Sequence, residues 1–346
     1  MHSTAQNIII AADFGGTKGD LLLVDAESGA ILKRVQEDIH SVPASVMGEK
    51  APTRGGGRSV EMGNYCLTKG LEGLSPQVVH IIYTGFNYDE SIFTSRGIRC
   101  VCPINLSEED GIMVAEDCKV GVCCILGTGA TTMIYKEGEP PFIVDALGPI
   151  CGDWGGGVYI GYNFVRNILR EQMFTAELMW ETSEILSYLE EQMIKMGEKP
   201  AVERARTPSW DIVRIFLRRH DRSFVASLAK LCDKCARQES AIARENLEKA
   251  GEEAAVNIVR GVRYTGVDKL ATLPVIVSGS ILLRSDIVYE SFCNVIKKHI
   301  PQAEIRRSYK PQTYGQTIRM LEILHGKEKA ASRIMRFKMD AVKMRL

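Results

Sequence analysis

Apolar and polar residues alternate in blocks along the chain, and the blocks predict two halves of similar design. Short apolar runs typical of strands cover residues 8–14, 19–26, 30–38, 78–85 and 98–103 in the first half, and 120–127, 131–137 and 142–148 in the second. Helical spacing is found at 107–116, at the start of the second half. Each half therefore opens with a hairpin whose turn is rich in Gly and Thr.

The rest of the chain is mostly helical in pattern. From Val158 to about Gly266 the apolar residues recur three and four positions apart, which predicts a helical insertion over about 158–266. A strand-like run ending in glycine, a helix, a short strand and a helix from about Thr313 follow. We expect an α/β protein with domains at 1–107 and 108–325. A last helix at about 326–346 is expected to pack back on the first domain.

Composition narrows the function classes. The 45% hydrophobic and 25% charged fractions are typical of a soluble globular protein, and the net charge of zero gives no general attraction to nucleic acid or acidic membranes. The polar start and the short apolar run after it do not match a signal peptide or a membrane span. We expect a cytoplasmic homodimer with no nucleic-acid or membrane partner. The ten cysteines are expected as reduced thiols, and Cys232 and Cys235 as helix residues and not metal ligands.

The first turn has the composition of a phosphate-binding site. Asp13 ends an apolar run and is followed by Gly15, Gly16, Thr17 and Lys18. Glycine lets backbone amides approach a phosphate closely, and threonine adds a hydroxyl donor. A carboxylate at the strand end suits Mg²⁺, which prefers oxygen ligands. We assign Asp13 to the metal and the other four residues to phosphate, although one such turn alone is also compatible with an ordinary tight hairpin.

Two further glycine turns support this assignment. Gly127, Thr128 and Gly129 stand at the equivalent place of the second half, and Gly279 and Ser280 follow a late strand. Two phosphate cradles facing one another would hold a nucleotide between two domains. The Walker A pattern is absent from the sequence, which excludes a P-loop enzyme.

Four segments together resemble a known family. Residues 13–25, 125–135, 147–161 and 275–285 are similar, in order and spacing, to the two phosphate motifs, the interdomain segment and the adenosine motif of the BadF/BadG/BcrA/BcrD-type ATPases. The likeness is greatest to the N-acetylglucosamine kinase-like members of the sugar kinase/actin/chaperone superfamily. It implies a duplicated ribonuclease-H-like (actin-like ATPase) fold, Mg²⁺ and ATP as cofactors, and domain closure around a sugar-like acceptor.

A carbohydrate kinase needs a base that accepts the proton of the attacked hydroxyl. The resemblance places an aspartate at the start of the helix before the second phosphate motif, and Asp110 matches it best. We expect this base near the mouth of the second domain. Glu109 and Asp117 remain alternatives by spacing, and each of the three could equally be a solvated helix-end carboxylate.

The acceptor side departs from the family pattern. Asp153 matches an acidic residue that faces sugar hydroxyls, but Trp154 follows where the family has Glu, and Thr131 replaces Asn. The family's sugar-contacting Asn has no clear match in the loop at 51–61. We expect these residues to bind a small aminosugar, sugar or cyclitol, with N-acetylglucosamine a poor substrate. Asp153 as a turn residue and Trp154 in the core are the structural alternatives.

Two other functions are compatible with the same fold. An ATP-driven activator of a radical enzyme would carry a [4Fe–4S] cluster, but its Gly-Gly-Gln-Asp and Cys-Ala-Ala-Gly-Thr-Gly motifs do not occur in the sequence. A regulatory ATP-binding protein without kinase activity is the second alternative. Asp13 and Asp110 favour an enzyme over this second alternative.

Overall fold

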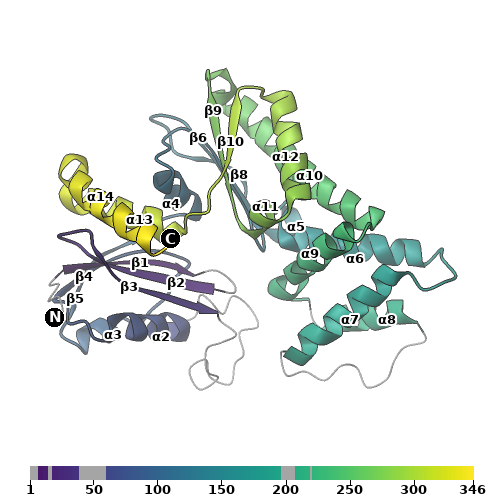
Figure 1. Ribbon diagram of the computed structural model, residues 1–346, viewed down its shortest axis with the longest axis horizontal. Coiled ribbons are helices and arrows are strands. Elements are labelled where there is room, and N and C mark those ends of the chain that lie inside the picture. Colours follow the sequence, from purple (N-terminus) through teal and green to yellow (C-terminus); the bar gives the residue numbers. More distant parts are fainter. Residues whose placement is uncertain (1–6, 15–17, 39–59, 196–206, 219) are drawn as a thin grey trace. The chain divides into compact units, whose positions relative to one another are not determined.

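The computed structural model describes residues 7–14, 18–38, 60–195, 207–218 and 220–346 (Figure 1). The chain divides into two compact units. The first unit is Met1–Lys119 with Tyr309–Leu346, and the second is Val120–Ser308. Each unit is built on one five-stranded sheet.

The first unit has a mixed sheet in the order β3-β2-β1-β4-β5. Its strands are β1 (Asn7–Phe14), β2 (Lys18–Asp25), β3 (Ile31–Asp38), β4 (Val78–Thr84) and β5 (Arg99–Asn105). Its described helices are α2 (Val60–Leu71), α3 (Ser91–Thr94), α4 (Glu108–Ala115), α13 (Gln312–His325) and α14 (Lys327–Lys343). The first three strands form an antiparallel meander, and β4 and β5 run parallel to β1 and β4.

The second unit repeats this topology, with the sheet order β10-β9-β6-β7-β8. Its strands are β6 (Gly121–Leu126), β7 (Ala130–Tyr135), β8 (Phe142–Asp145), β9 (Leu273–Ser278) and β10 (Ala303–Arg307). Its described helices are α5 (Gly148–Cys151), α6 (Gly157–Gln172), α7 (Trp180–Lys195), α8 (Pro208–Arg218), α9 (Arg222–Arg237), α10 (Ala241–Thr265), α11 (Ser280–Arg284) and α12 (Asp286–His299), with the 3₁₀ helix η3 (Val267–Lys269). The meander β6-β7-β8 and the parallel strands β9 and β10 match the first unit strand for strand. Helices α6 to α10 form the predicted insertion.

Strand β1 is buried on both faces, as expected for the centre of a sheet covered by helices on both sides. Ile8 and Ile10 belong to a core cluster with α2 and α3, whereas Ile9 and Ala11 belong to a second cluster with α13 and α14. Figure 1 shows the same division, with α2 and α3 on one side of this sheet and α13 and α14 on the other. Because side chains alternate along a strand, Asp13 continues the stripe that faces α13.

The boundaries of the units differ from the expected domains. The sequence placed the division at 107/108 and assigned α4 and α13 to the second domain, but both helices belong to the first unit. They pack so closely that a Cβ added to Gly315 would lie 1.7 Å from the backbone oxygen of Gly111. A contact between segments two hundred residues apart leaves no local pattern, so the sequence could not reveal it.

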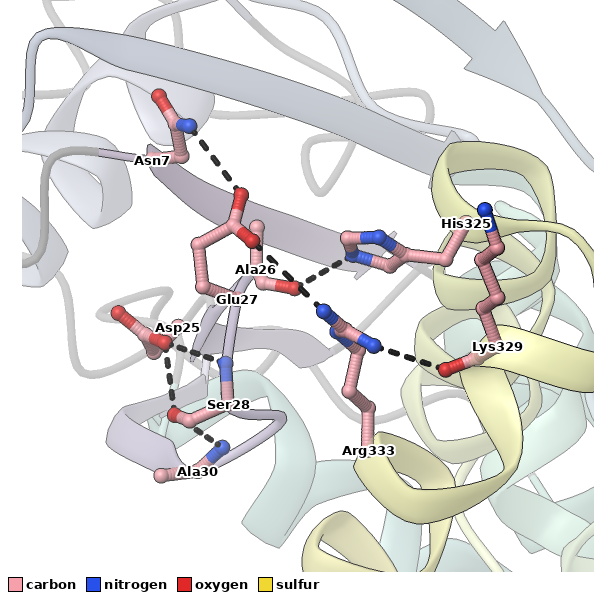
Figure 2. Close-up of polar contacts among 9 residues, drawn as sticks. All are labelled: Asn7, Asp25, Ala26, Glu27, Ser28, Ala30, His325, Lys329 and Arg333. Carbon is pink, nitrogen blue, oxygen red and sulfur yellow. Dashed lines mark hydrogen bonds and ion pairs between the residues drawn. The ribbon is translucent and has the colours of Figure 1, made fainter.

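The last helix, α14, packs on the first unit. Phe337 is fully buried in the core cluster that α14 shares with β1 and β2. At the edge of this contact, His325 Nε2 lies 2.8 Å from the backbone oxygen of Ala26, and Arg333 pairs with Glu27 at 3.8 Å (Figure 2). The basic C-terminal segment therefore uses its apolar stripe for packing within this unit.

The helical interpretation of Cys232 and Cys235 is confirmed. Both lie buried on α9, and Cys232 Sγ donates to the backbone oxygen of Ala243 at 3.5 Å. Burial raises the pKa of the Cys232 thiol. In the described part of the chain no three His, Cys, Asp or Glu residues gather as a metal site, and no helix there has the length and apolar character needed to cross a membrane.

Candidate active site

Asp13 lies near the end of β1, on the face that α13 covers. The ladder places it opposite Asp20 of β2 and beside Thr84 of β4. Asp20 itself forms an ion pair with Arg34 at 2.8 Å and accepts from Thr313 Oγ1 at 3.1 Å. At this end of the sheet, Asp20, Asp13 and Thr84 on three neighbouring strands therefore replace the apolar residues that face α13 along the rest of the sheet.

Gln312, the first residue of α13, connects Asp13 to α4. With its amide in the orientation that satisfies both its oxygen and its nitrogen, Gln312 donates to the two carboxylate oxygens of Asp13 at 2.9 and 3.0 Å. Its amide oxygen accepts from the backbone N–H of Glu108 at 3.2 Å and lies 3.0 Å from Thr84 Oγ1. One side chain therefore holds Asp13 within reach of the first turn of α4.

Asp110 lies in that first turn. The hydroxyl of Ser107 caps the helix by accepting from the Asp110 N–H at 3.0 Å. Glu109 is buried, whereas Asp117 is exposed beyond the other end of α4 with a left-handed φ of 51°. Asp110 is thus a partly exposed candidate base. It lies in the first turn of α4, the end of this helix that Gln312 connects to Asp13. The base was expected on the second domain, but Asp110 belongs to the first unit.

The first phosphate turn is only partly described. Gly15, Gly16 and Thr17 lie outside the described residues, and Lys18 is exposed as the first residue of β2. Asp13 itself fits Mg²⁺, because this ion takes one or two protein carboxylates and completes its shell with phosphates and water.

The second turn predicted to bind phosphate, Gly127–Gly129, is held by the start of α6. The carbonyls of Gly127 and Thr128 accept from the backbone N–H groups of Gly157 and Val158 at 2.8 and 3.0 Å. A Cβ added to Gly127 would meet no described atom within 4 Å, so the chain is open to an incoming group at that point. The turn has the anchored backbone and the free space that a phosphate cradle requires.

The third glycine turn packs against the end of the same strand. Gly279 has a φ of 87°, and a Cβ there would lie 2.3 Å from the backbone oxygen of Leu126. A side chain at this position would collide with β6, which explains the glycine. Ser280 is exposed and begins α11. Within the second unit, the structure therefore brings the Gly127 and Gly279 turns together at the end of β6.

Asp153 is a buried residue beside the Gly127–Gly129 turn. It has a left-handed φ of 56°, and its Oδ1 accepts from the Gly148 N–H at 3.1 Å. Its Oδ2 accepts from Arg222 Nη2 at 2.8 Å. Asp145 orients the segment, since its carboxylate accepts from the backbone N–H groups of Asp153 and Trp154 at 3.1 and 2.9 Å. Burial raises the pKa of Asp145.

The predicted acceptor residues Trp154 and Thr131 differ in the exposure of their side-chain groups. Trp154 is 38% exposed and its ring centroid lies 5.8 Å from that of Tyr159, so it does not lie in the core. Thr131 pairs with Ile125 next to the turn. Its buried hydroxyl has no hydrogen-bond partner among the described residues. An apolar ring and an unsatisfied hydroxyl are therefore present in this unit.

Sequence reasoning missed three residues of these arrangements. Asp145 could have been suspected, because it ends a strand-like run just before the motif that contains Asp153. Gln312 and Arg222 lie at the starts of helices and carry no local signal. Their partners are 299 and 69 positions away, and such distant pairings emerge only from the folded chain.

Comparisons with known proteins agree with this architecture. The chain is 22% identical over 324 residues to an N-acetyl-D-glucosamine kinase of Dictyostelium discoideum, covering 87% of this chain and 93% of that protein. No family model matches the chain.

Solved structures show the same fold. A candidate N-acetylglucosamine kinase from Chromobacterium violaceum has a TM-score of 0.61 at 15% identity, covering 92% of this chain and 99% of that one. A ROK-family glucokinase from Streptomyces griseus, in complex with glucose and AMPPNP, has a TM-score of 0.51 at 13% identity, with coverages of 90% and 97%. These findings confirm the predicted duplicated actin-like ATPase fold and the resemblance to the N-acetylglucosamine kinase-like sugar kinases.

Proposed function

We propose that the chain is an ATP-dependent sugar kinase that transfers the γ-phosphoryl group to a hydroxyl of a small sugar-like acceptor. The observation that carries this proposal is the Gln312 bridge, which holds the carboxylate of Asp13 beside the helix turn that contains Asp110. A metal-binding carboxylate and a base are the two acidic groups that such a transfer uses. The similarity to an N-acetylglucosamine kinase along 87% of the chain supports the same function.

In the proposed reaction, Asp110 accepts the proton of the acceptor hydroxyl as its oxygen attacks the γ-phosphorus. The bond from that phosphorus to the oxygen bridging the β- and γ-phosphates breaks, and ADP leaves. Asp13 is the residue that would hold Mg²⁺, which when bound neutralises charge on the phosphates. Gln312 keeps the Asp13 carboxylate in place through its two hydrogen bonds.

Backbone groups of the glycine turns would bind phosphate in this proposal. Gly127, Thr128 and Gly129 would contribute amides and a hydroxyl from the second unit, with Gly279 and Ser280 on the adenosine side. Gly15, Gly16, Thr17 and Lys18 are the corresponding candidates of the first unit. The open space at Gly127 and the hydrogen bonds that fix its turn to α6 support this role.

We further propose that the acceptor is an aminosugar, sugar or cyclitol other than N-acetylglucosamine. The exposed ring of Trp154 offers a flat apolar surface for a sugar face, whereas a glutamate there would accept hydrogen bonds from hydroxyls. Threonine at position 131 lacks the paired donor and acceptor of an asparagine amide, and its own hydroxyl is buried, so this position offers fewer contacts to sugar hydroxyls. An apolar ring in place of a carboxylate favours acceptors with fewer hydroxyls on the side that meets Trp154.

The test is a comparison of kcat/KM for N-acetylglucosamine, glucosamine, glucose and a cyclitol panel, with sugar phosphates identified by mass spectrometry. Trp154→Glu should raise kcat/KM for N-acetylglucosamine about tenfold relative to the other acceptors, because hydrogen bonds to hydroxyls are strongly discriminating. Trp210→Glu is the matched control, since Trp210 is an exposed tryptophan on α8. Efficient phosphorylation of N-acetylglucosamine by the native protein would contradict the acceptor assignment.

A further inference from the structure

Arg222 stands at the second phosphate turn, although no motif points to it. It is the first residue of α9, and the side chain of Asp221 caps this helix by accepting from the Phe224 N–H at 3.0 Å. A Cβ added to Gly129 would lie 2.6 Å from Arg222 Nη2 and 2.4 Å from Asp153 Oδ2. The guanidinium and the carboxylate therefore touch the backbone of the turn, and a larger residue at position 129 would displace them.

The two partners of this ion pair differ sharply in exposure. The side chain of Asp153 is 4% exposed, whereas that of Arg222 is 56% exposed. A guanidinium has five N–H donors, and in the described part of the chain Asp153 is the group that Arg222 contacts, through Nη2. The buried carboxylate of Asp153 holds one edge of the guanidinium. The other N–H groups of Arg222 are accessible to a ligand beside the turn.

We infer that Arg222 binds the polyphosphate of the nucleotide at the Gly127–Gly129 turn, with Asp153 as its positioning residue. The inference rests on the proposed kinase function. An arginine held by one carboxylate is well suited to a second anion, because its planar fork makes charge-assisted, often bidentate hydrogen bonds to phosphate. A neutral sugar hydroxyl would gain less from such a donor.

This assignment changes the interpretation of Asp153. The family resemblance gives that position to sugar binding, but both carboxylate oxygens are already hydrogen-bonded, to Gly148 and Arg222. Its left-handed backbone conformation and burial fit a residue that organises a site. In this chain Asp153 acts on the nucleotide through Arg222.

The experiment is calorimetric titration of the native protein and of Arg222→Gln with ATP, ADP and adenosine in the presence of Mg²⁺ and without sugar. We expect Arg222→Gln to bind ATP about 10- to 100-fold more weakly, as for the loss of a hydrogen bond to a charged group, with adenosine affinity unchanged. Arg222→Lys should fall between the two, because lysine keeps the charge and loses the fork.

Arg237→Gln is the matched control. Arg237 lies on the last turn of the same helix, pairs with Asp233 at 2.7 Å and is 62% exposed. Its ATP affinity should stay within about twofold of the native value, as expected for an exposed pair of little energetic weight. Thermal melting of all variants checks that the fold is intact.

Three outcomes would overturn the inference. Native ATP affinity in folded Arg222→Gln would remove Arg222 from the phosphate site, and a raised KM for the sugar with unchanged ATP affinity would place it on the acceptor side. A native protein that binds ATP but phosphorylates no acceptor would contradict the proposed kinase alone, since the titration still decides the role of Arg222. A native protein that binds no nucleotide would contradict both.

Discussion

The two units share one topology, yet the ends of their first hairpins carry different side chains. One rung before the last pair of the β1–β2 ladder, Asp13 faces Asp20. At the equivalent rung of the β6–β7 ladder, Ile125 faces Thr131. The duplicated fold determines where each turn lies, and the residues at that rung place two carboxylates beside the turn of the first unit and no charged side chain beside that of the second.

The side chains around these two turns differ between the units as well. In the first unit, the amides and hydroxyls of α13 meet the two carboxylates, as with Thr313 and Asp20 at 3.1 Å. In the second unit, a half-exposed guanidinium, that of Arg222, stands at the glycine turn. A phosphoryl transfer needs both environments, because a metal and a base require carboxylates, whereas a polyphosphate requires amides and cations.

The largest expected effect on turnover comes from a substitution in the first unit. Asp110→Asn should lower turnover by about two to four orders of magnitude, the usual contribution of a general base, while the fold and ATP binding are retained. Steady-state rates, circular dichroism and nucleotide titration measure the three quantities. Asp117→Asn is the control at the other end of α4, where asparagine also tolerates the left-handed backbone. Near-native turnover of Asp110→Asn would move the role of base to Glu109.

Asp13→Ala tests the metal side of the same unit. Loss of this carboxylate should lower the rate by about two orders of magnitude and raise the Mg²⁺ concentration needed for half-maximal activity, because the metal loses its protein ligand. The measurement is the rate as a function of Mg²⁺ at saturating ATP. An unchanged Mg²⁺ dependence would show that the turn after β1 has a structural role alone.

A smaller effect is expected at the glycine turn of the second unit. Gly127→Ala should weaken ATP binding about tenfold without loss of stability, since the added methyl enters the space predicted for phosphate and meets no described atom. Gly315→Ala is the contrasting variant, because its methyl would overlap Gly111 in the α4–α13 contact. It should lower the free energy of unfolding by about 1–3 kcal/mol or more. Native ATP affinity in Gly127→Ala would remove this turn from the nucleotide site.

The smallest effect concerns acid sensitivity in the first unit. Burial, followed by the charge of Arg99, lowers the pKa of His80 on β4 from its usual value of 6.5. The unfolded chain therefore binds a proton more readily than the folded one, and stability should fall as the pH drops below about 6.5. His80→Gln should flatten this decline in melting temperature between pH 7.5 and 5. An identical decline in the variant would assign it to other groups.

The sequence predicted the strands better than the site. Apolar runs such as the one at β1 are local signals, and the glycine turns between them follow from the same pattern. The division into units was wrong at α4 and α13, because it depends on the contact of Gly111 with Gly315. Gln312 and Arg222 were missed for the same reason: a long-range partner gives a side chain its role.

The central claim is that the γ-phosphoryl group passes from ATP to a sugar-like hydroxyl. The most direct measurement uses ATP labelled with ¹⁸O in its γ-phosphoryl group, a pool of aminosugars, neutral sugars and cyclitols, and mass spectrometry of the products. A kinase should form labelled phosphate ester and ADP in equal amounts, and the ester should be lost in Asp110→Asn. Label found in inorganic phosphate alone would contradict this claim and identify the chain as an ATPase.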